Sequence, residues 1–212
     1  MLLMLLLLLL LTLPAVVQAQ FTYTTNNGTI TITGYTGSGG AVTVPSTTNG
    51  YPVTCIGYNA FYECTKLTSI AIPDSVTTIG HSAFGYCSSL TSVTIPDSVT
   101  DITDDAFQDC ARLTAILVDV QNSFYSSVNG VLFTKDQTTL VVYAPGKTGS
   151  YAIPDGVTQI GYRAFAGCSG LTRLIISRTV NDIATEAFIY CPNFEAIEVN
   201  ELNPVVTVQV LR

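Results

Sequence analysis

Val76-Thr77-Thr78-Ile79-Gly80 opens the stretch that decides the fold; Ala83-Phe84, Cys87 and Leu90 follow it, and Val93-Thr94-Ile95-Pro96 closes it. The same skeleton recurs along the chain. Five phenylalanines each follow an alanine and precede a cysteine by three residues: Phe61, Phe84, Phe107, Phe165 and Phe188. Successive phenylalanines are 23, 23, 58 and 23 residues apart, and 58 is one 23-residue period plus an insertion of 35 residues. A fixed period of this size is typical of a solenoid, in which one supersecondary unit is stacked repeatedly.

The spacing within each unit predicts which side chains are buried. Ala83, Phe84 and Cys87 have the spacing of a single helical turn with one buried side. The valine and isoleucine that close the unit alternate inward along a strand. A single unit would bury these side chains on one side only, so units must stack at the strand spacing of about 4.8 Å. The predicted fold is a β-rich solenoid, a stack of short parallel strands and single helical turns with β-hairpin insertions.

The pattern divides the chain into six expected segments. They are a signal peptide (1–19), an N-terminal hairpin with a capping half-repeat (20–50), repeats (51–118), a β-meander insertion (119–150), further repeats (151–199) and a truncated C-terminal tail (200–212). Asn26-Asn27-Gly28 and Asn129-Gly130 each separate two extended runs, which indicates hairpin turns. We expect the N-terminal hairpin to cap the solenoid and the meander to pack as an excursion at one edge.

The leader predicts secretion. Met1-Leu2-Leu3-Met4 leads into a leucine run, and Val17-Gln18-Ala19 places small residues at the positions that precede a cleavage site, although no Lys or Arg comes first. The alternative is an uncleaved membrane anchor. However, the apolar run has 16 residues, from Leu2 to Val17, and a spanning helix needs about 20. We therefore expect a secreted or cell-surface protein with no stable membrane span after signal cleavage.

Charge and composition exclude some classes of partner. Fifteen acidic and eight basic residues give a formal net charge of −7, and the basic residues form no stripe. Binding to nucleic acid and electrostatic docking on anionic membranes are therefore disfavoured. The abundance of Thr, Val and Ile, together with few charges, favours sheet over helix.

Five of the six cysteines share one position of the repeat: Cys64, Cys87, Cys110, Cys168 and Cys191. This ladder points inward, and we favour buried free thiols over disulfides, because parallel side chains on neighbouring strands give poor S–S geometry. Cys55 is off the ladder and has no obvious mate. A tetrahedral zinc site is not expected, since His81 is the only histidine and no C-x₂-C pair exists. We expect no cofactor.

The acidic patch and the single histidine could each be part of a functional site or simply lie on a solvated surface. Asp101, Asp104, Asp105 and Asp109 form the densest acidic patch; paired carboxylates can hydrolyse glycosides or bind calcium, but no EF-hand-like spacing is present. A solvated face is the favoured interpretation. His81 occupies a variable position of the repeat, so we expect it to be exposed and unconstrained. Asn27-Gly28-Thr29 is a glycosylation sequon, relevant only in a eukaryotic secretory pathway.

The exposed strand face is the remaining candidate for function. Its expected residues are Thr68, Ser69, Thr91, Ser92, Thr94, Thr114 and Arg173. Solenoids use such extended, repetitive faces to bind partners. The alternative, which the sequence leaves open, is that Thr and Ser are simply favourable residues on an exposed strand.

These motifs resemble the BspA-like class of leucine-rich repeat proteins. The unit A-F-x-x-C-x-x-L-T-x-[IV]-x-I-P-x-S-V-T-x-I-G is the motif of that class, and it occurs here five times. The N-terminal hairpin and the insertion with N-G-V-L-F are similar to features of the same class, so the resemblance covers residues 21–204. It implies a right-handed leucine-rich-repeat solenoid, secretion or surface display, and a binding role; some members are associated with adhesion to host or matrix proteins. Departures are Thr103 and Ala184 at the Gly80 position, and Phe194 where leucine is expected.

The end of the chain predicts a second insertion. Aligning Phe107 with Phe188 places Asn203 on Asn122, after which the sequence diverges at Val205. We expect a truncated or frameshifted gene product, or a piece of a longer array.

The functional hypotheses belong to different classes. The leading one is a secreted or cell-surface, non-catalytic binding module for an extracellular protein or glycan. The first alternative is a structural or vestigial segment of a larger surface protein without its own ligand. A further alternative is an extracellular hydrolase that acts through the patch Asp101–Asp109. The sequence predicts neither the identity of the ligand nor the oligomeric state.

Overall fold

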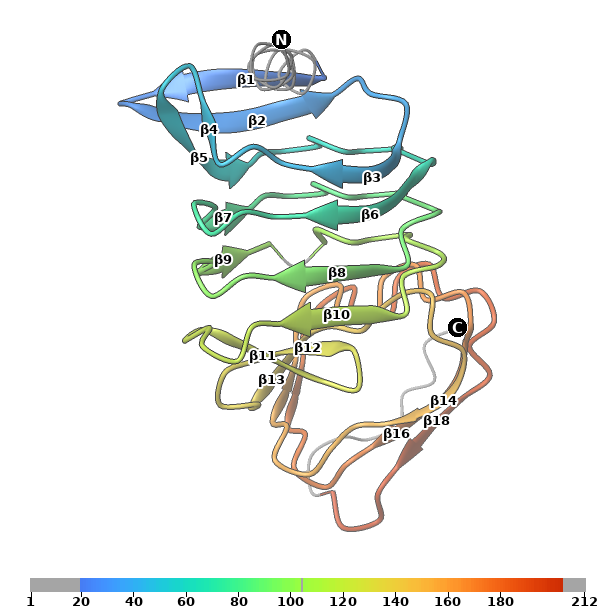
Figure 1. The fold of residues 1–212 in the computed structure, drawn as a ribbon. Helices are drawn as coiled ribbons and strands as arrows, with labels where there is room; N and C mark the ends of the chain where they lie inside the picture. The colour runs from blue at the N-terminus through green and yellow to red at the C-terminus, as the bar shows by residue number, and fades with distance from the viewer. Residues whose placement is uncertain (1–19, 104, 204–212) are drawn as a thin grey trace, which may run out of the picture.

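The computed structural model of this protein describes residues 20–103 and 105–203. The predicted signal peptide, Asp104 and the predicted divergence after residue 204 lie outside the described residues. Within the described ranges the regular elements are all strands, stacked along one long axis as Figure 1 shows. No helix in this part of the chain is long and apolar enough to span a membrane.

The N-terminal block, residues 20–118, contains two sheets. The first sheet has the order β1 (Phe21–Asn26), β2 (Thr29–Tyr35), β5 (Tyr51–Ile56), β7 (Thr78–Ile79), β9 (Asp101–Ile102), with β4 (Thr47–Thr48) paired to β5. The second sheet has the order β10 (Ala115–Val118), β8 (Ser92–Ile95), β6 (Leu67–Ala71), β3 (Gly40–Thr43). After the β1–β2 hairpin, equivalent strands of successive repeats pair in parallel, as the solenoid prediction requires.

The C-terminal block, residues 125–203, repeats the same plan. The third sheet has the order β11 (Tyr125–Val128), β12 (Val131–Thr134), β13 (Thr139–Val142), β15 (Gln159–Ile160), β17 (Asp182–Ile183). The fourth sheet has the order β14 (Gly149–Ala152), β16 (Leu171–Ile176), β18 (Ala196–Val199). In each block an antiparallel hairpin begins one sheet and parallel strands continue it.

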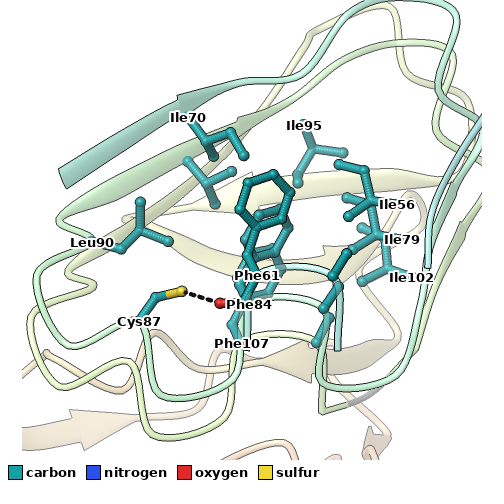
Figure 2. Packing of buried hydrophobic residues seen from close by; sticks show 14 of the residues in the cluster. Ile56, Phe61, Ile70, Ile79, Phe84, Cys87, Leu90, Ile95, Ile102 and Phe107 are labelled. Atoms are coloured by element: carbon teal, nitrogen blue, oxygen red, sulfur yellow. Dashed lines mark hydrogen bonds between the residues drawn. The ribbon is translucent and has the colours of Figure 1, made fainter. Parts of the chain in front are cut away.

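The core consists of ladders of identical side chains. In the first sheet Ile79 pairs in register with Ile56 and with Ile102. The rings of Phe61, Phe84 and Phe107 stack between the two sheets, with centroids 5.2 and 5.3 Å apart. Figure 2 shows this stack, with the isoleucine row on one side and Leu90 and Cys87 on the other. The inward positions predicted from the sequence are confirmed, since the labelled residues of the ladder are buried.

Hydrogen-bonded turns stand in place of the expected helical turns. Ser82 and Tyr86 flank Ala83-Phe84 with φ of 49° and 59°. Cys87 N donates to the Phe84 carbonyl three residues earlier, as in a tight turn. Residues in the left-handed region cannot continue a right-handed helix, so the segment closes into two consecutive turns. The repeat therefore keeps one buried side at this corner without forming a helix.

The insertion belongs to the core. Val131, Leu132 and Phe133 are all buried. Leu132 packs into the core of the N-terminal block, whereas Val131 and Phe133 on the opposite face pack into that of the C-terminal block. The expected excursion at one edge is wrong, because β12 is apolar on both faces and lies between two cores. The meander closes the first stack and starts the second.

Tyr143 shows how the second stack starts. Its ring stacks on Phe165 at 5.0 Å, and its backbone N donates to the Ala164 carbonyl. Tyr35 occupies the equivalent place before the first repeat, with its ring 5.3 Å from Phe61. Each block thus begins with a tyrosine in the position that phenylalanine holds in the full repeats.

The two blocks do not form one continuous pair of sheets. In Figure 1, β3, β6, β8 and β10 lie one above another, but β14, β16 and β18 lie below β10 and are inclined to it. The corners of the blocks nevertheless remain in contact, because a Cβ on Gly167 would lie 2.7 Å from Asp109 N. We call this region the block junction. The meander separates the sheets there, while the corners stay closed.

Gly130 provides a test of how the meander is attached. Its carbonyl accepts a hydrogen bond from Ile116 N on β10, and a Cβ would lie 2.8 Å from the Thr114 carbonyl oxygen. We expect Gly130→Ala to lower the free energy of unfolding by about 1–3 kcal/mol more than Gly40→Ala.

Gly40 is the matched control for this comparison. Both glycines have φ of 78°, but a Cβ on Gly40 would meet nothing within 4 Å. Backbone strain is therefore common to the two variants, and the difference measures the steric contact with β10. Urea unfolding followed by far-UV circular dichroism supplies the two free energies. Equal losses of unfolding free energy in the two variants would contradict a close steric contact between Gly130 and the chain at the start of β10.

Candidate functional site

Six of the seven predicted ligand-binding residues lie along the second sheet: Thr68 and Ser69 on β6, Ser92 and Thr94 on β8, and Thr91 and Thr114 directly before β8 and β10. Ser69 and Ser92 are register partners on β6 and β8. Their side chains point away from the core because their neighbours Ile70 and Val93 point into it. The structure brings these six residues together, and whether they bind a ligand remains a prediction.

The threonine row also stabilises the stack. Thr91 Oγ1 and backbone N donate to the Thr68 carbonyl at 3.4 and 3.3 Å. Thr114 repeats both contacts with the Thr91 carbonyl, at 3.4 and 3.0 Å. Part of the reason for threonine at this position is therefore structural, as the alternative interpretation of the sequence allowed.

Arg173 is separated from the other six residues. It lies on β16 in the fourth sheet, and its Nη2 is 2.5 Å from Oε1 of Glu198 on β18. Both side chains are about half exposed, so this ion pair contributes little to stability. The structure does not bring Arg173 onto the face that carries the threonines.

Exposed apolar side chains on β10 and just after it are not predicted from the sequence. Leu117 is exposed on β10, in register with Thr94, and Val120 and Phe124 are exposed in the segment that follows. Lys135 holds that segment in place with two hydrogen bonds. Its Nζ donates to the Val120 carbonyl, and its backbone N donates to the Phe124 carbonyl. The repeat pattern gave little signal, since the position of Leu117 is held by Ala71, Thr94, Ile175 and Glu198 in the other repeats.

The block junction contains a buried carboxylate. Asp105 is 3% exposed, and its Oδ2 lies 2.9 Å from Nδ1 of His81 and 3.5 Å from Nη1 of Arg163. Neither nitrogen is aligned for a hydrogen bond with this oxygen. The expected solvated acidic face is wrong for Asp105, which is buried where Arg163 of the next block meets this corner. His81 is exposed as expected, but it is constrained by Asp105 and by the stacked ring of Tyr58. A hydrolytic role would require a carboxylate that is free to meet substrate, and Asp105 is occupied by two basic groups.

The alternation of charges continues within the C-terminal block. Arg163 Nε donates to Glu186 Oε2 at 2.7 Å, and the Tyr162 hydroxyl donates to the same oxygen at 3.0 Å. These contacts, Arg163 first, lower the pKa of Glu186 below its ordinary value. The stabilisation is therefore present above the ordinary carboxylate range and is lost as pH falls through the lowered pKa.

An open groove lies beside the same corner. It has a volume of about 350 Å³ and is lined by Tyr86 and Asp109 from the N-terminal block and by Gly167 and Tyr190 from the C-terminal block. Asp109 Oδ2 is buried and has no hydrogen-bond partner. None of the seven predicted residues contributes to this groove. Sequence reasoning could not find it, since it depends on how the two blocks meet.

The cysteine ladder is made of free thiols, and all six cysteines are unpaired. Burial raises the pKa of Cys110 and Cys168 well above the ordinary value, so they remain neutral. The thiols also serve as donors to the carbonyl of the preceding phenylalanine, with Sγ to O distances of 3.1 Å for Cys87 to Phe61, 3.0 Å for Cys110 to Phe84 and 3.0 Å for Cys191 to Phe165. No group of ligands for a metal ion is present in the described ranges.

Comparison with known families gives one match. The model described as the BspA type leucine rich repeat region matches six copies over residues 42–139 and 142–207. These ranges cover well over half of the chain. No curated protein matches the sequence.

Solved structures of similar fold include repeat proteins of bacteria. The T. pallidum leucine rich repeat protein is 25% identical, with a TM-score of 0.54 over 78% of this chain and 79% of its own. The pneumococcal vaccine antigen PcpA is 21% identical, with a TM-score of 0.54 over 86% of this chain and 69% of its own. A leucine rich cell surface protein of Faecalibacterium prausnitzii is 24% identical, with a TM-score of 0.45 over 84% and 74% of the two chains. The first two share the solenoid architecture described above.

Proposed function

This chain belongs to the BspA-type leucine-rich repeat family, and from that premise we propose that it is a secreted or cell-surface binding module without catalytic activity. The partner is an extracellular protein or glycan, and the role is adhesion-like. The leader predicted from the sequence supports export. The surface that carries the proposal is the outer face of the second sheet.

One observation favours this face. Parallel pairing in register places equivalent side chains of successive repeats side by side, as with Ser69 and Ser92. The face is polar and weakly charged, and its edge strand β10 carries the exposed apolar side chain of Leu117. Interfaces commonly combine an apolar anchor with surrounding polar groups. An extended partner that lies across the strands would meet both kinds of surface.

The test is binding of the purified full chain to arrays of extracellular matrix proteins and glycans. We expect saturable binding to at least one class of partner. Thr94→Arg, which places a long charged side chain on the exposed face, is expected to weaken that binding at least tenfold, corresponding to about 1.4 kcal/mol. Leu117→Ala is expected to weaken it by a similar factor through loss of the apolar anchor.

Thr185→Arg serves as the control. Thr185 is exposed at a corner of the C-terminal block, outside the second sheet, so its variant carries the same added charge without touching the face. Binding is expected to change less than twofold in this variant. Absence of saturable binding throughout the arrays would contradict the proposed binding function. It would favour the alternative that the chain is a structural segment of a larger surface protein.

A further inference from the structure

The groove at the block junction arises from one position of the repeat. This position, two residues after each core phenylalanine, is held by Glu63, Tyr86, Asp109, Gly167 and Tyr190 in chain order. Their side chains form a column along the corners of the stack, and Gly167 is the member without a side chain. A Cβ there would lie 2.6 Å from Asp109 Oδ1, so glycine is required where the two blocks meet. The missing side chain leaves the groove between its neighbours.

Two aromatic rings flank this groove. Tyr86 is 38% exposed and Tyr190 is 64% exposed, each from a different block. Ser169 and Pro192 complete the wall on the side of the C-terminal block. Exposed aromatic rings that face a common space are suited to hold an alkyl chain or a cation.

The third element of the groove is the Asp109 carboxylate. Asp109 Oδ2 is buried and accepts no hydrogen bond, and among the described residues no basic side chain forms an ion pair with Asp109. Arg163, the basic residue of the junction, is engaged by Asp105 and Glu186 instead. The charge of Asp109, together with burial and a side-chain hydrogen bond to Asp109, raises the pKa of the neighbouring Tyr86 hydroxyl, so this carboxylate lies beside one of the two rings. A half-buried carboxylate without a basic partner is costly, so a ligand that brings a positive charge would be stabilised there.

We propose that the groove formed by Tyr86, Asp109 and Tyr190 binds the ammonium or guanidinium side chain of a lysine or arginine residue on a partner polypeptide. The carboxylate pairs with the cation, and the tyrosine rings cover its alkyl stem. The formal net charge of −7 favours approach of a basic partner. A neutral sugar would also stack on the rings but would leave the carboxylate unneutralised. This site is distinct from the face of the second sheet.

The experiment titrates the ¹⁵N-labelled full chain with small probes. N-acetyl-lysinamide and N-acetyl-argininamide carry the proposed groups, N-acetyl-norleucinamide is the uncharged match of the lysine probe, and methyl glucoside represents a sugar. We expect both cationic probes to shift the amide resonances of Asp109, Gly167 and Tyr190, with a dissociation constant on the order of 1 mM. The two neutral probes are expected to bind at least tenfold more weakly.

Three variants separate the groove from general charge effects. Asp109→Asn removes the charge, and asparagine suits the left-handed backbone there, where φ is 55°. Tyr190→Asn removes one ring from an exposed position with φ of 59°. Asp155→Asn removes the same charge as the first variant from an exposed site outside the groove. The first two are expected to weaken binding of the lysine probe about tenfold, and the third less than twofold.

Four outcomes would overturn the proposal. They are equal weakening by Asp109→Asn and Asp155→Asn, equal affinity for the norleucine probe, stronger binding of methyl glucoside, and shifts that do not centre on the groove. The ¹⁵N spectra report whether each variant is folded. Because none of the three variants touches the second sheet, failure here leaves the binding function of that face unaffected, and the reverse is also true.

Discussion

Replacing Phe84 with alanine is expected to lower the free energy of unfolding by about 3–5 kcal/mol. The ring is completely buried, and it stacks on Phe61 at 5.2 Å and on Phe107 at 5.3 Å. Truncation removes contacts with the repeat above and with the repeat below. Each repeat of a solenoid contacts only its neighbours, so no other element could fill the space. The cavity therefore lies in the middle of the N-terminal stack, where collapse of the surroundings is most restricted.

Tyr58→Ala is the control for this prediction. Tyr58 is 66% exposed at a corner of the same block, where its ring stacks on His81. Its replacement is expected to cost about 0.5 kcal/mol or less. Urea unfolding by circular dichroism gives both values, and tyrosine fluorescence provides a second probe because the chain has no tryptophan. A loss for Phe84→Ala as small as that for Tyr58→Ala would contradict the stacked core.

Asn122→Ala is expected to lower the free energy of unfolding by about 2–4 kcal/mol. The side chain is fully buried at the start of the meander. Its Nδ2 donates to the Pro96 and Val99 carbonyls at 2.8 and 2.9 Å, and its Oδ1 accepts from the backbone N of Phe124 and Tyr125, both at 2.8 Å. Alanine leaves the two buried carbonyls and the two half-buried N–H groups without this partner, so the meander loses its attachment to the last repeat.

Asn203 offers a matched comparison within the same chain. Its Nδ2 donates to the Ser177 and Val180 carbonyls at 2.9 and 2.8 Å, the equivalent pair one block later. Asn203 is only half buried, so Asn203→Ala is expected to cost about 1–2 kcal/mol, less than Asn122→Ala. Asn122→Asp adds a second test, because it keeps the acceptor oxygen and removes the two donors. If Asn122→Asp were as stable as the wild type, the two donated bonds would not be important.

The alignment of these two asparagines was visible in the sequence. Placing Phe188 on Phe107 predicted that Asn203 would correspond to Asn122, and both amides make the same pair of hydrogen bonds. The inward ladders were predictable for the same reason, since an apolar side chain that recurs every 23 residues can be buried only by its own copies. Periodicity thus determines the contacts within a block.

Contacts between blocks were not predictable from periodicity. Tyr143 replaces phenylalanine and precedes Ala144, so the motif A-F does not mark it as the first rung of the second stack. Asp105 becomes buried only because Arg163 and the corner around it stack on the same side. Asp105 and Arg163 are 58 residues apart in the sequence, and the path of the meander determines how close they come in space. The groove at the junction follows from that path and not from a motif.

The candidate binding face was also predictable within a block and not between blocks. Thr68, Thr91 and Thr114 could be placed in one row because they occupy one position of the repeat. Arg173 also fits a repeat position but belongs to the other block, and a sequence alignment of repeats cannot show that its strand is in a different sheet. Predictions of a shared surface are therefore reliable within a block and fail across the meander.

The separated sheets have a geometric consequence for any protein that repeats this cap-and-stack unit. An uninterrupted solenoid of this kind would be a rod in which each repeat is rotated only slightly from the one before. Here the meander wedges the sheets apart while the corners around Asp109 and Gly167 stay closed, so the rod bends at that point. A succession of such units would form a series of stacks with a bend at each junction, and the outer face of each stack would point in a different direction.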